Sequence, residues 1–435
     1  MGLAARERPP ADAALTLTLL LSLAACHDAG TGASPVIPCD PDNGGLSLPP
    51  GFCAVVVARA VGTARHLAVR PNGDVYVAVD NSATATGAVL ALRDTDGDGH
   101  ADVQERFGPT GGNGIAWQGT SLYFAPNDRV LRYEFSGNAL LPTSGPVTVV
   151  AGLPADGEHV RKTVVPDQNG GLFVNIGSAT DACQVANRIP LSPGVFPCPE
   201  LGIRAGVWRF NASGTGQTQA DGVRFASELR NMNALALDPA DGVLYGVQNG
   251  RDFLSLYWPS LFTLQDHVVL PAEELLRIEQ GKLYGWPYCF FDALKNLNLL
   301  NPEYGGDGSL VGMCQGRERP VVAFPAHWAP LGMLFYTGSQ FPAEYTGGLF
   351  VAFHGSQPAP PAPGGGFVVT FLPWRNGGPS GTYRVFADGF AAGTFTVAGA
   401  AHRAVGLAQG PDGSLYVSDD QAGWIWRVSY VGVGN

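Results

Sequence analysis

The chain has 435 residues, among them 59 glycines and 34 prolines; 14% of its residues are charged and 45% are hydrophobic. This composition is too apolar and too aromatic for a disordered protein, and the length suits one large all-β domain or two or three smaller ones. The formal net charge of −11, with no basic patch to offset it, argues against a nucleic-acid partner.

The first segment has the features of an export signal. Arg6 and Arg8 precede an apolar run over residues 13–25, which is shorter than the ~20 residues of a bilayer span. The run ends in Leu-Ala-Ala before Cys26, which resembles a bacterial lipobox; ordinary cleavage beside an incidental cysteine is the alternative. We therefore expect a lipoprotein signal peptide over residues 1–25 and a flexible tether over residues 26–47. The mature protein is then exported, either periplasmic or at the cell surface, and anchored through Cys26.

Six cysteines remain if Cys26 carries the lipid, and an even number in an exported protein indicates disulfides. Several pairings are possible, and the chain contains no Cys-x-x-Cys motif that would favour zinc or redox chemistry. We favour the pairs closest in sequence, each of which closes a short loop: Cys39–Cys53, Cys183–Cys198 and Cys289–Cys314.

One pattern recurs along the chain: a short apolar strand, a polar turn, and a second strand that ends in aromatic and aliphatic residues. Its six copies cover residues 67–77, 114–124, 163–174, 234–245, 332–351 and 405–417. One such sheet cannot bury both of its faces, so repetition of this kind is typical of radial architectures. We predict an all-β fold, a six-bladed β-propeller of four-stranded antiparallel blades over residues 48–430. A two-sheet sandwich is the alternative, and it explains the repetition less well.

The copies are unevenly spaced, which predicts three long inserted loops gathered on one face around the central channel. These loops are expected over residues 181–230, 252–328 and 355–402. Residues 52–60 are expected to close the ring by pairing with the last blade after residues 424–428, and a short helix is expected near residues 273–278.

An acidic segment after the first repeat has the spacing of a calcium-binding loop. Carboxylates stand at loop positions 1, 3, 5, 9 and 12, glycine at 6 and histidine at 7, where the sharp turn and the hard oxygen ligands of Ca²⁺ are needed. The candidate ligands are Asp94, Asp96, Asp98, His100, Asp102 and Glu105. A solvated acidic turn is the alternative, and in either case the loop is expected to stiffen a strand connection without taking part in catalysis.

Three polar or cationic residues precede repeats at equivalent positions and should converge on one channel mouth. His159, followed by Arg161 and Lys162, precedes the third repeat and could act as a general base. Arg230 with Asn231 precedes the fourth repeat, and Arg403 the sixth, where guanidinium groups could bind a planar anion. Each residue alone is equally compatible with an ordinary hydrogen-bonded loop position.

Taken together, these features resemble the soluble aldose sugar dehydrogenases that depend on pyrroloquinoline quinone (PQQ), also called glucose/sorbosone dehydrogenases. The resemblance covers about residues 48–430 and depends on the order of many short landmarks. These are Leu48-Pro-Pro-Gly-Phe52, the acidic loop, His159, Gly177-Ser178, Arg230-Asn231, Glu274-Leu-Leu-Arg-Ile, Tyr284-Gly-Trp-Pro287, Ala329-Pro330, His354-Gly-Ser356, Arg403-Ala-Val-Gly406 and Ser418-Asp-Asp420.

The resemblance implies roles for particular residues. His159 would be the base that takes the proton of the sugar C1 hydroxyl, and Arg230 and Asn231 would hold the quinone oxygens. Gly250 and Arg251, with Asn249 beside them, would bind a cofactor calcium ion through backbone carbonyls. Arg403 would bind the cofactor carboxylates. It also implies a small sugar substrate, PQQ and Ca²⁺ as cofactors, and a separate electron acceptor.

One departure from the family concerns the segment after His354-Gly-Ser356. Residues 355–366 contain no Lys or Arg, where the family usually has a basic residue. Arg375 is the nearest cation downstream, and Arg161 or Lys162 could compensate. The alternatives are therefore a non-catalytic surface propeller that binds a glycan or protein, and a calcium-dependent lactonase-type propeller, for which no comparable set of inward Glu, Asn and Asp residues is visible.

Overall fold

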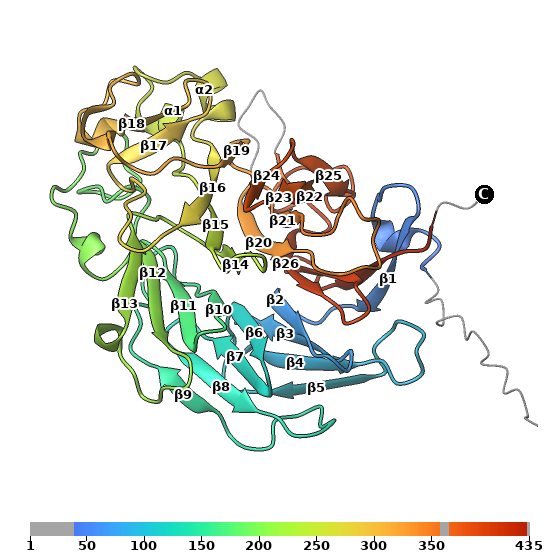
Figure 1. Cartoon of the computed structure of the whole chain (residues 1–435). Coiled ribbons are helices and arrows are strands. Elements are labelled where there is room, and N and C mark those ends of the chain that lie inside the picture. Colours follow the sequence, from blue (N-terminus) through green and yellow to red (C-terminus); the bar gives the residue numbers. More distant parts are fainter. Residues whose placement is uncertain (1–38, 357–364, 433–435) are drawn as a thin grey trace, which may run out of the picture. The chain divides into compact units, whose positions relative to one another are not determined.

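The computed structural model describes residues 39–356 and 365–432, which form six four-stranded antiparallel sheets (Figure 1). The first three blades follow the chain in order. Blade 1 has β2 (Ala64–Val69), β3 (Val75–Val79), β4 (Ala88–Arg93) and β5 (Val103–Phe107). Blade 2 has β6 (Gly114–Gln118), β7 (Ser121–Ala125), β8 (Val130–Glu134) and β9 (Val147–Val150). Blade 3 has β10 (Val164–Pro166), β11 (Gly171–Ile176), β12 (Gly206–Asn211) and β13 (Val223–Ser227).

The other three blades carry insertions or use strands from both ends of the chain. Blade 4 has β14 (Ala234–Leu237), β15 (Leu244–Gln248), β16 (Glu273–Ile278) and β19 (Val322–Phe324). Blade 5 has β20 (Pro330–Phe335), β21 (Leu349–Phe353), β22 (Val368–Leu372) and β25 (Arg384–Ala387). Blade 6 has β26 (Ala404–Gln409), β27 (Leu415–Asp419), β28 (Ile425–Tyr430) and β1 (Phe52–Ala58).

Small elements decorate blades 4 and 5. The helices α1 (Leu254–Tyr257) and α2 (Leu264–Val269) and the hairpin of β17 (Cys289–Asp292) and β18 (Leu297–Leu300) belong to blade 4. Blade 5 carries the hairpin of β23 (Trp374–Arg375) and β24 (Gly378–Pro379). In the described part of the chain, no helix is long and apolar enough to cross a membrane.

The innermost strands of the six blades lie side by side in a closed ring, in the order β2, β6, β10, β14, β20 and β26. Neighbouring inner strands come very close; a methyl group on Gly332 of β20 would lie 2.2 Å from the carbonyl oxygen of Val405 in β26. Glycine is therefore needed at that position, because only a residue without a side chain allows two backbones to approach so closely.

Each sheet packs against both neighbouring sheets, so the middle strands are buried on both faces; β3 and β21 are buried at every residue. Between blades 5 and 6, Phe52 meets Phe341 and Phe386 edge to face, with ring centroids 4.8 and 5.1 Å apart. These aromatic contacts add to the burial of apolar area that holds the blades together.

The predicted fold is confirmed: each of the six repeats forms the two inner strands of one blade. The predicted closure is confirmed as well, since β1 pairs with β28 from Phe52 opposite Tyr430 to Ala58 opposite Ile425. The three predicted disulfides, Cys39–Cys53, Cys183–Cys198 and Cys289–Cys314, are all present. The predicted signal peptide and Cys26 lie outside the described residues, as does most of the predicted tether.

Two expectations were wrong. Residues 273–278 form strand β16, not a helix, because the apolar side chains of Leu275, Leu276 and Ile278 are buried between blades, which outweighs the helix propensity of the segment. The predicted loops 181–230, 252–328 and 355–402 contain the outer strands of blades 3, 4 and 5. The connections after the second strands of these blades are shorter and span residues 177–205, 249–272 and 354–367.

Candidate functional site

The strand directions bring two sets of residues to one face of the propeller, which we call the site face. Since strands one and two of a blade are antiparallel, the start of each inner strand and the end of each second strand lie at the same end of the sheet. His159, Arg230 and Arg403 precede inner strands. Asp80, Asp181, Asp252, His354 and Asp420 follow second strands. The predicted convergence on one channel mouth therefore follows from the topology of the blades.

His159 is held from one side by the chain that follows β11. Its Nδ1 lies 2.9 Å from the Ser178 hydroxyl and 3.1 Å from the Ser178 carbonyl oxygen. Gly177 allows this approach, because a methyl group there would lie 2.6 Å from the Cβ of His159. The Ser178 amide in turn donates to the carbonyl of Arg230 at 2.8 Å, which ties blades 3 and 4 together.

The hydrogen bonds of Ser178 fix the tautomer of His159. The Ser178 hydroxyl donates its proton to the carbonyl of Thr180 at 2.7 Å, so it can only accept from the imidazole. A carbonyl oxygen also only accepts, so Nδ1 carries the ring proton on both counts. Nε2 is then an unprotonated lone pair, with no hydrogen-bond partner among the residues that the structure describes.

Electrostatics keep this imidazole neutral. Burial, followed by the positive charge of Arg230, lowers the pKa of His159 to about 3, although the carboxylates of Glu158 and Asp252 oppose the shift. A neutral imidazole with a free Nε2 can accept a proton at ordinary pH.

Arg230 is buried beside His159, and its guanidinium is held at every nitrogen. It donates to the Asp181 carboxylate at 2.7 Å, to Asp252 at 3.0 Å and to the carbonyl of Gly250 at 2.7 Å. Burial would raise the pKa of Asp252, but Arg230 and Arg188 outweigh it and hold that pKa well below its usual range.

Arg188 and Arg251 complete the ion network of blades 3 and 4. Arg188 bridges Asp252 and Glu158, the neighbour of His159, with contacts of 2.8 and 2.7 Å. Arg251 lies in the interior and pairs with Glu303 at 2.6 Å. The arginines of this side therefore have carboxylate partners within the protein.

A second group of charges comes from blades 5, 6 and 1. Arg403 donates to the backbone carbonyls of His354 and Gly355 at 3.1 and 2.6 Å. Within the described segments it forms no ion pair. Asp420 accepts from His354 at 2.6 Å and from Arg65 at 2.5 Å.

Arg65 and Arg161 connect the two groups. Arg161 donates to Asp80 at 2.8 Å and stands two residues after His159. Burial and the nearby charge of Arg161 lower the pKa of Arg65 to about 10, so it remains a cation at neutral pH. Cations from blades 1, 3, 4 and 6 thus surround the mouth of the channel.

The other predicted residues lie apart from this cluster or form hydrogen bonds within the protein. Lys162 is buried, and its ammonium donates to the carbonyls of Pro154 and Val160 at 2.8 and 2.5 Å. The side chain of Asn249 donates to the carbonyl of Pro330 at 2.9 Å, and that of Asn231 accepts from Asn233 at 3.1 Å. Arg375 is exposed on β23 of the outer hairpin.

The acidic loop connects β4 to β5 at the opposite end of blade 1, away from the site face. Carboxylate oxygens of Asp94, Asp96 and Asp102 lie within 4.8 Å of one another. His100 contacts the carbonyl of Val56 through Nδ1 at 2.8 Å, and Glu105 lies within β5 opposite Ala91. Calcium binding by this loop, which includes Asp98, stays a prediction.

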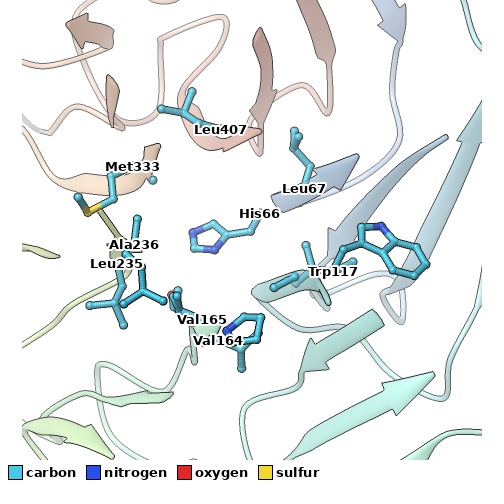
Figure 2. Close-up of a pocket in the computed structure, with 15 residues that line it drawn as sticks. His66, Leu67, Trp117, Val164, Val165, Leu235, Ala236, Met333 and Leu407 are labelled. Atoms are coloured by element: carbon cyan, nitrogen blue, oxygen red, sulfur yellow. The ribbon is translucent and has the colours of Figure 1, made fainter. Parts of the chain in front are cut away.

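Below the charged mouth, the inner strands of all six blades line a cavity of about 320 Å³ (Figure 2). Its walls are mostly aliphatic, and Figure 2 shows the His66 ring in the middle of the group. The Nε2 of His66 donates to the carbonyl of Leu331 at 2.7 Å, and burial lowers the pKa of His66 to about 4. The channel interior is therefore uncharged, and the charges are confined to the mouth.

Sequence reasoning missed most of the acidic half of the cluster, namely Asp80, Asp181 and Asp252, and the buried Arg65. It named Asp420 only within the Ser418-Asp-Asp420 landmark and gave it no role. A signal existed, because Asp80 and Asp420 follow the second strand of their repeats at matching positions. Acidic residues at strand ends are so common in turns that the position alone did not mark them.

Comparison with known proteins places the chain in a family. The model of the TrAA12-like family matches residues 46–431. The chain belongs to the TrAA12-like family.

Solved structures share the fold of this member of the TrAA12-like family. A Trichoderma reesei protein of carbohydrate-active enzyme family AA12 is 18% identical, with a TM-score of 0.72, over 89% of this chain and 98% of that one. The PQQ domain of a pyranose dehydrogenase from Coprinopsis cinerea is 18% identical, with a TM-score of 0.70, over 88% of this chain and 97% of that one.

Curated relatives match over shorter stretches. A Borreliella burgdorferi protein is 29% identical over 203 residues, which is 46% of this chain and 47% of that protein. An aldose sugar dehydrogenase of Escherichia coli is 28% identical over 98 residues, which is 22% of this chain and 25% of that enzyme. The chain thus matches about half or less of the length of these relatives. The predicted resemblance to the aldose sugar dehydrogenases is confirmed for the fold, which solved aldose sugar dehydrogenases share with this chain at 16% identity.

Proposed function

We propose that this protein is a sugar oxidoreductase that removes two electrons from an aldose or a related sugar at the site face, with PQQ as hydride acceptor. The observation that carries the proposal is the neutral His159, whose Nδ1 proton is fixed by Ser178 and whose Nε2 is free beside the cationic Arg230. The names of the solved relatives, an AA12 protein and a pyranose dehydrogenase PQQ domain, support it.

The residues of the chain have separate tasks in this proposal. His159 accepts the proton of the sugar C1 hydroxyl at Nε2, because that nitrogen is unprotonated at the working pH. Arg230 presents a fixed positive charge where negative charge develops, and Asp181 and Asp252 hold its guanidinium in place. PQQ, when bound, supplies the two-electron acceptor for the hydrogen at C1.

The charges at the mouth fit an acidic, planar group. Among the described residues, the Arg403 side chain donates hydrogen bonds only to backbone carbonyls, faces the Phe367 ring at 5.9 Å, and pairs with no carboxylate. Arg161 is about 41% exposed, so both side chains can still bind an anionic group. A carboxylate there would gain charge-assisted hydrogen bonds from guanidinium groups. Arg161 is the exposed cation that compensates here for the lack of Lys or Arg in residues 355–366, whereas Lys162 is buried against backbone carbonyls.

The backbone at Gly250 and Arg251 is less suited to bind a calcium ion than the arginines at the mouth are to bind an anion. The Gly250 carbonyl already accepts a hydrogen bond from Arg230, so a cation at that oxygen would lie close to a guanidinium. Calcium therefore stays a prediction for both the cofactor and the acidic loop, and no step of the reaction depends on it here.

The test uses the mature chain, first titrated with PQQ by calorimetry and then assayed for dye reduction with a panel of aldoses. We expect one-to-one binding and aldose-dependent turnover, and we expect His159→Ala to lower turnover by at least about 100-fold but leave binding intact. His100→Ala, a histidine on the opposite face, is the matched control. No binding at about millimolar PQQ, which corresponds to a free energy weaker than about −4 kcal/mol, would overturn the proposal. That result would favour the non-catalytic surface propeller.

A further inference from the structure

An apolar surface borders the proposed active site. We call it the apolar rim; its residues come from the connections after the second strands of blades 3 and 4. They are Val185, Ile189, Leu191, Phe253, Leu256 and Leu264. Five of these side chains are between 54% and 69% exposed, and Phe253 is 37% exposed. A cluster of large aliphatic side chains in water is unusual for a soluble protein and indicates a contact surface.

The two connections form one surface that reaches the site. The Leu191 amide donates to the carbonyl of Tyr257 in α1 at 3.0 Å, which joins the first connection to the second. Arg188, between Val185 and Ile189, pairs with both Asp252 and Glu158, the neighbours of Phe253 and His159. The apolar rim therefore lies at the edge of the cluster that holds the base and Arg230.

Packing explains the apolar rim only in part, since the Phe253 ring contacts Tyr257 and stacks on His267 while the other five side chains are more than half exposed. Leu191 and Phe253 have backbone φ angles of +58° and +54°, a left-handed conformation that is unfavourable for residues with a side chain. Both also expose apolar side chains to water. Strain and exposure at the same residues beside a site favour a functional reason for the arrangement.

The proposed reaction requires an electron acceptor. Oxidation of a sugar hemiacetal to the lactone breaks the C1–H and O–H bonds, forms the C1=O bond, and releases two electrons and two protons. The protons pass to water, the first of them through His159. The two electrons must leave the protein, and two molecules of a one-electron acceptor can take one each.

We propose that the apolar rim is the docking surface for a small, basic, one-electron redox protein that receives these electrons. This inference rests on the proposed function. The six side chains offer on the order of 400 Å² of apolar surface, which is about half of what one partner of a stable dimer buries and falls in the range of transient redox encounters. The net charge of −11 favours a basic partner, which it would attract at long range.

Two other occupants fit less well. A second copy of this chain would need a larger surface and would carry the same negative charge. An anionic membrane surface would need free cations, whereas residues 253–265 contain no charged residue, and Arg188 and Arg251 are held in ion pairs.

The experiment compares two variants of the mature chain. The rim variant carries Ile189→Ser, Leu256→Ser and Leu264→Ser. The control carries Leu141→Ser, Val223→Ser and Val385→Ser, which are exposed apolar residues of comparable size away from the site. Circular dichroism checks the fold of both, and Leu191→Asn, which suits a positive φ, provides a second, conservative probe of the surface.

Binding is measured first, without cofactor, as the dissociation constant for a basic cytochrome c on an immobilised chain at low ionic strength. We expect the rim variant to weaken binding at least tenfold and the control to leave it unchanged. With PQQ and sugar, cytochrome c reduction should fall in parallel while reduction of a small dye stays the same.

Three results would overturn the inference: no cytochrome c binding by the native chain, equal binding by the rim variant, or a native dimer that the rim variant dissociates. Absence of dye reduction in the native protein would instead contradict the proposed function. The binding measurement separates the two failures because it needs no turnover.

Discussion

The two sides of the site differ in how their charges are balanced. On the side of blades 3 and 4, Arg230, Arg188 and Arg251 are matched by carboxylates of the protein, and two disulfides close loops in these two blades. On the side of blades 5, 6 and 1, Arg403 pairs with no carboxylate of the described residues, and its guanidinium donates to two backbone carbonyls and faces the Phe367 ring. The charges on the side of blades 3 and 4 are therefore already balanced within the protein. The side of blades 5, 6 and 1 keeps an unpaired positive charge that can bind an anionic ligand. We therefore assign chemistry to the first side and anchoring of the cofactor to the second.

The largest expected effect concerns the base. Replacing His159 by Ala should lower kcat by about 10²- to 10⁴-fold without changing PQQ affinity, because general-base catalysis contributes about that much. Calorimetry and steady-state kinetics measure the two effects separately. If PQQ affinity fell and kcat did not, His159 would belong to the anchoring side.

The pH profile of the native enzyme tests the same residue. The base works only when neutral, and with its pKa lowered to about 3 it remains neutral throughout the range from pH 7 to 5. We expect kcat/KM to show no histidine limb between these values. A decline with a midpoint near 6.5 would contradict the lowered pKa of His159.

The next largest effect concerns the stability of the ion network in blades 3 and 4. Asp181→Asn should lower the free energy of unfolding by about 3 to 5 kcal/mol, because it leaves Arg230 and Arg251 buried without their shared carboxylate. Urea unfolding measures it. Asp128→Asn, in an exposed pair with Arg129, should cost at most about 1 kcal/mol. Equal losses in the two variants would mean that the buried network is not the stabilising element.

A moderate effect is expected on the anchoring side. Arg403→Gln should weaken PQQ binding by about 10- to 100-fold, the loss of roughly 1.5 to 3 kcal/mol from one hydrogen bond to a charged group. Turnover at saturating PQQ should change little. Arg375→Gln, exposed on β23, is the control, and a similar loss there would rule out a specific role for Arg403.

The smallest effect should come from Ser178. Ser178→Ala removes one acceptor of the Nδ1 proton but keeps the backbone carbonyl, so kcat should fall about fivefold, for a loss of about 1 kcal/mol. Ser178 is a positioning residue, and its loss should alter kcat more than KM. An unchanged kcat would show that the carbonyl alone fixes the tautomer.

Much of the fold was predictable because the propeller repeats its signal six times. The inner hairpin of each blade combines apolar alternation with a turn, and even the irregular copy at residues 332–351 formed β20 and β21. The outer strands were missed in blades 3 to 5, where insertions of different length separate them from the repeat. Strand β16 shows where prediction from local sequence fails. Glu273 and Glu274 favour a helix by their residue type, and only their burial in the structure explains why they lie in a strand.

The sequence by itself predicted the number of blades, the ring closure, the favoured set of three disulfides and the cationic residues before the inner strands. These features depend on local pattern or on short separations along the chain. Only the tertiary structure decided which carboxylates neutralise which arginines, that Ser178 fixes the proton of His159, and that Arg65 joins the mouth. The physical reason is that these contacts join residues of different blades or of separate connections, and their charge balance depends on burial that no local pattern reveals.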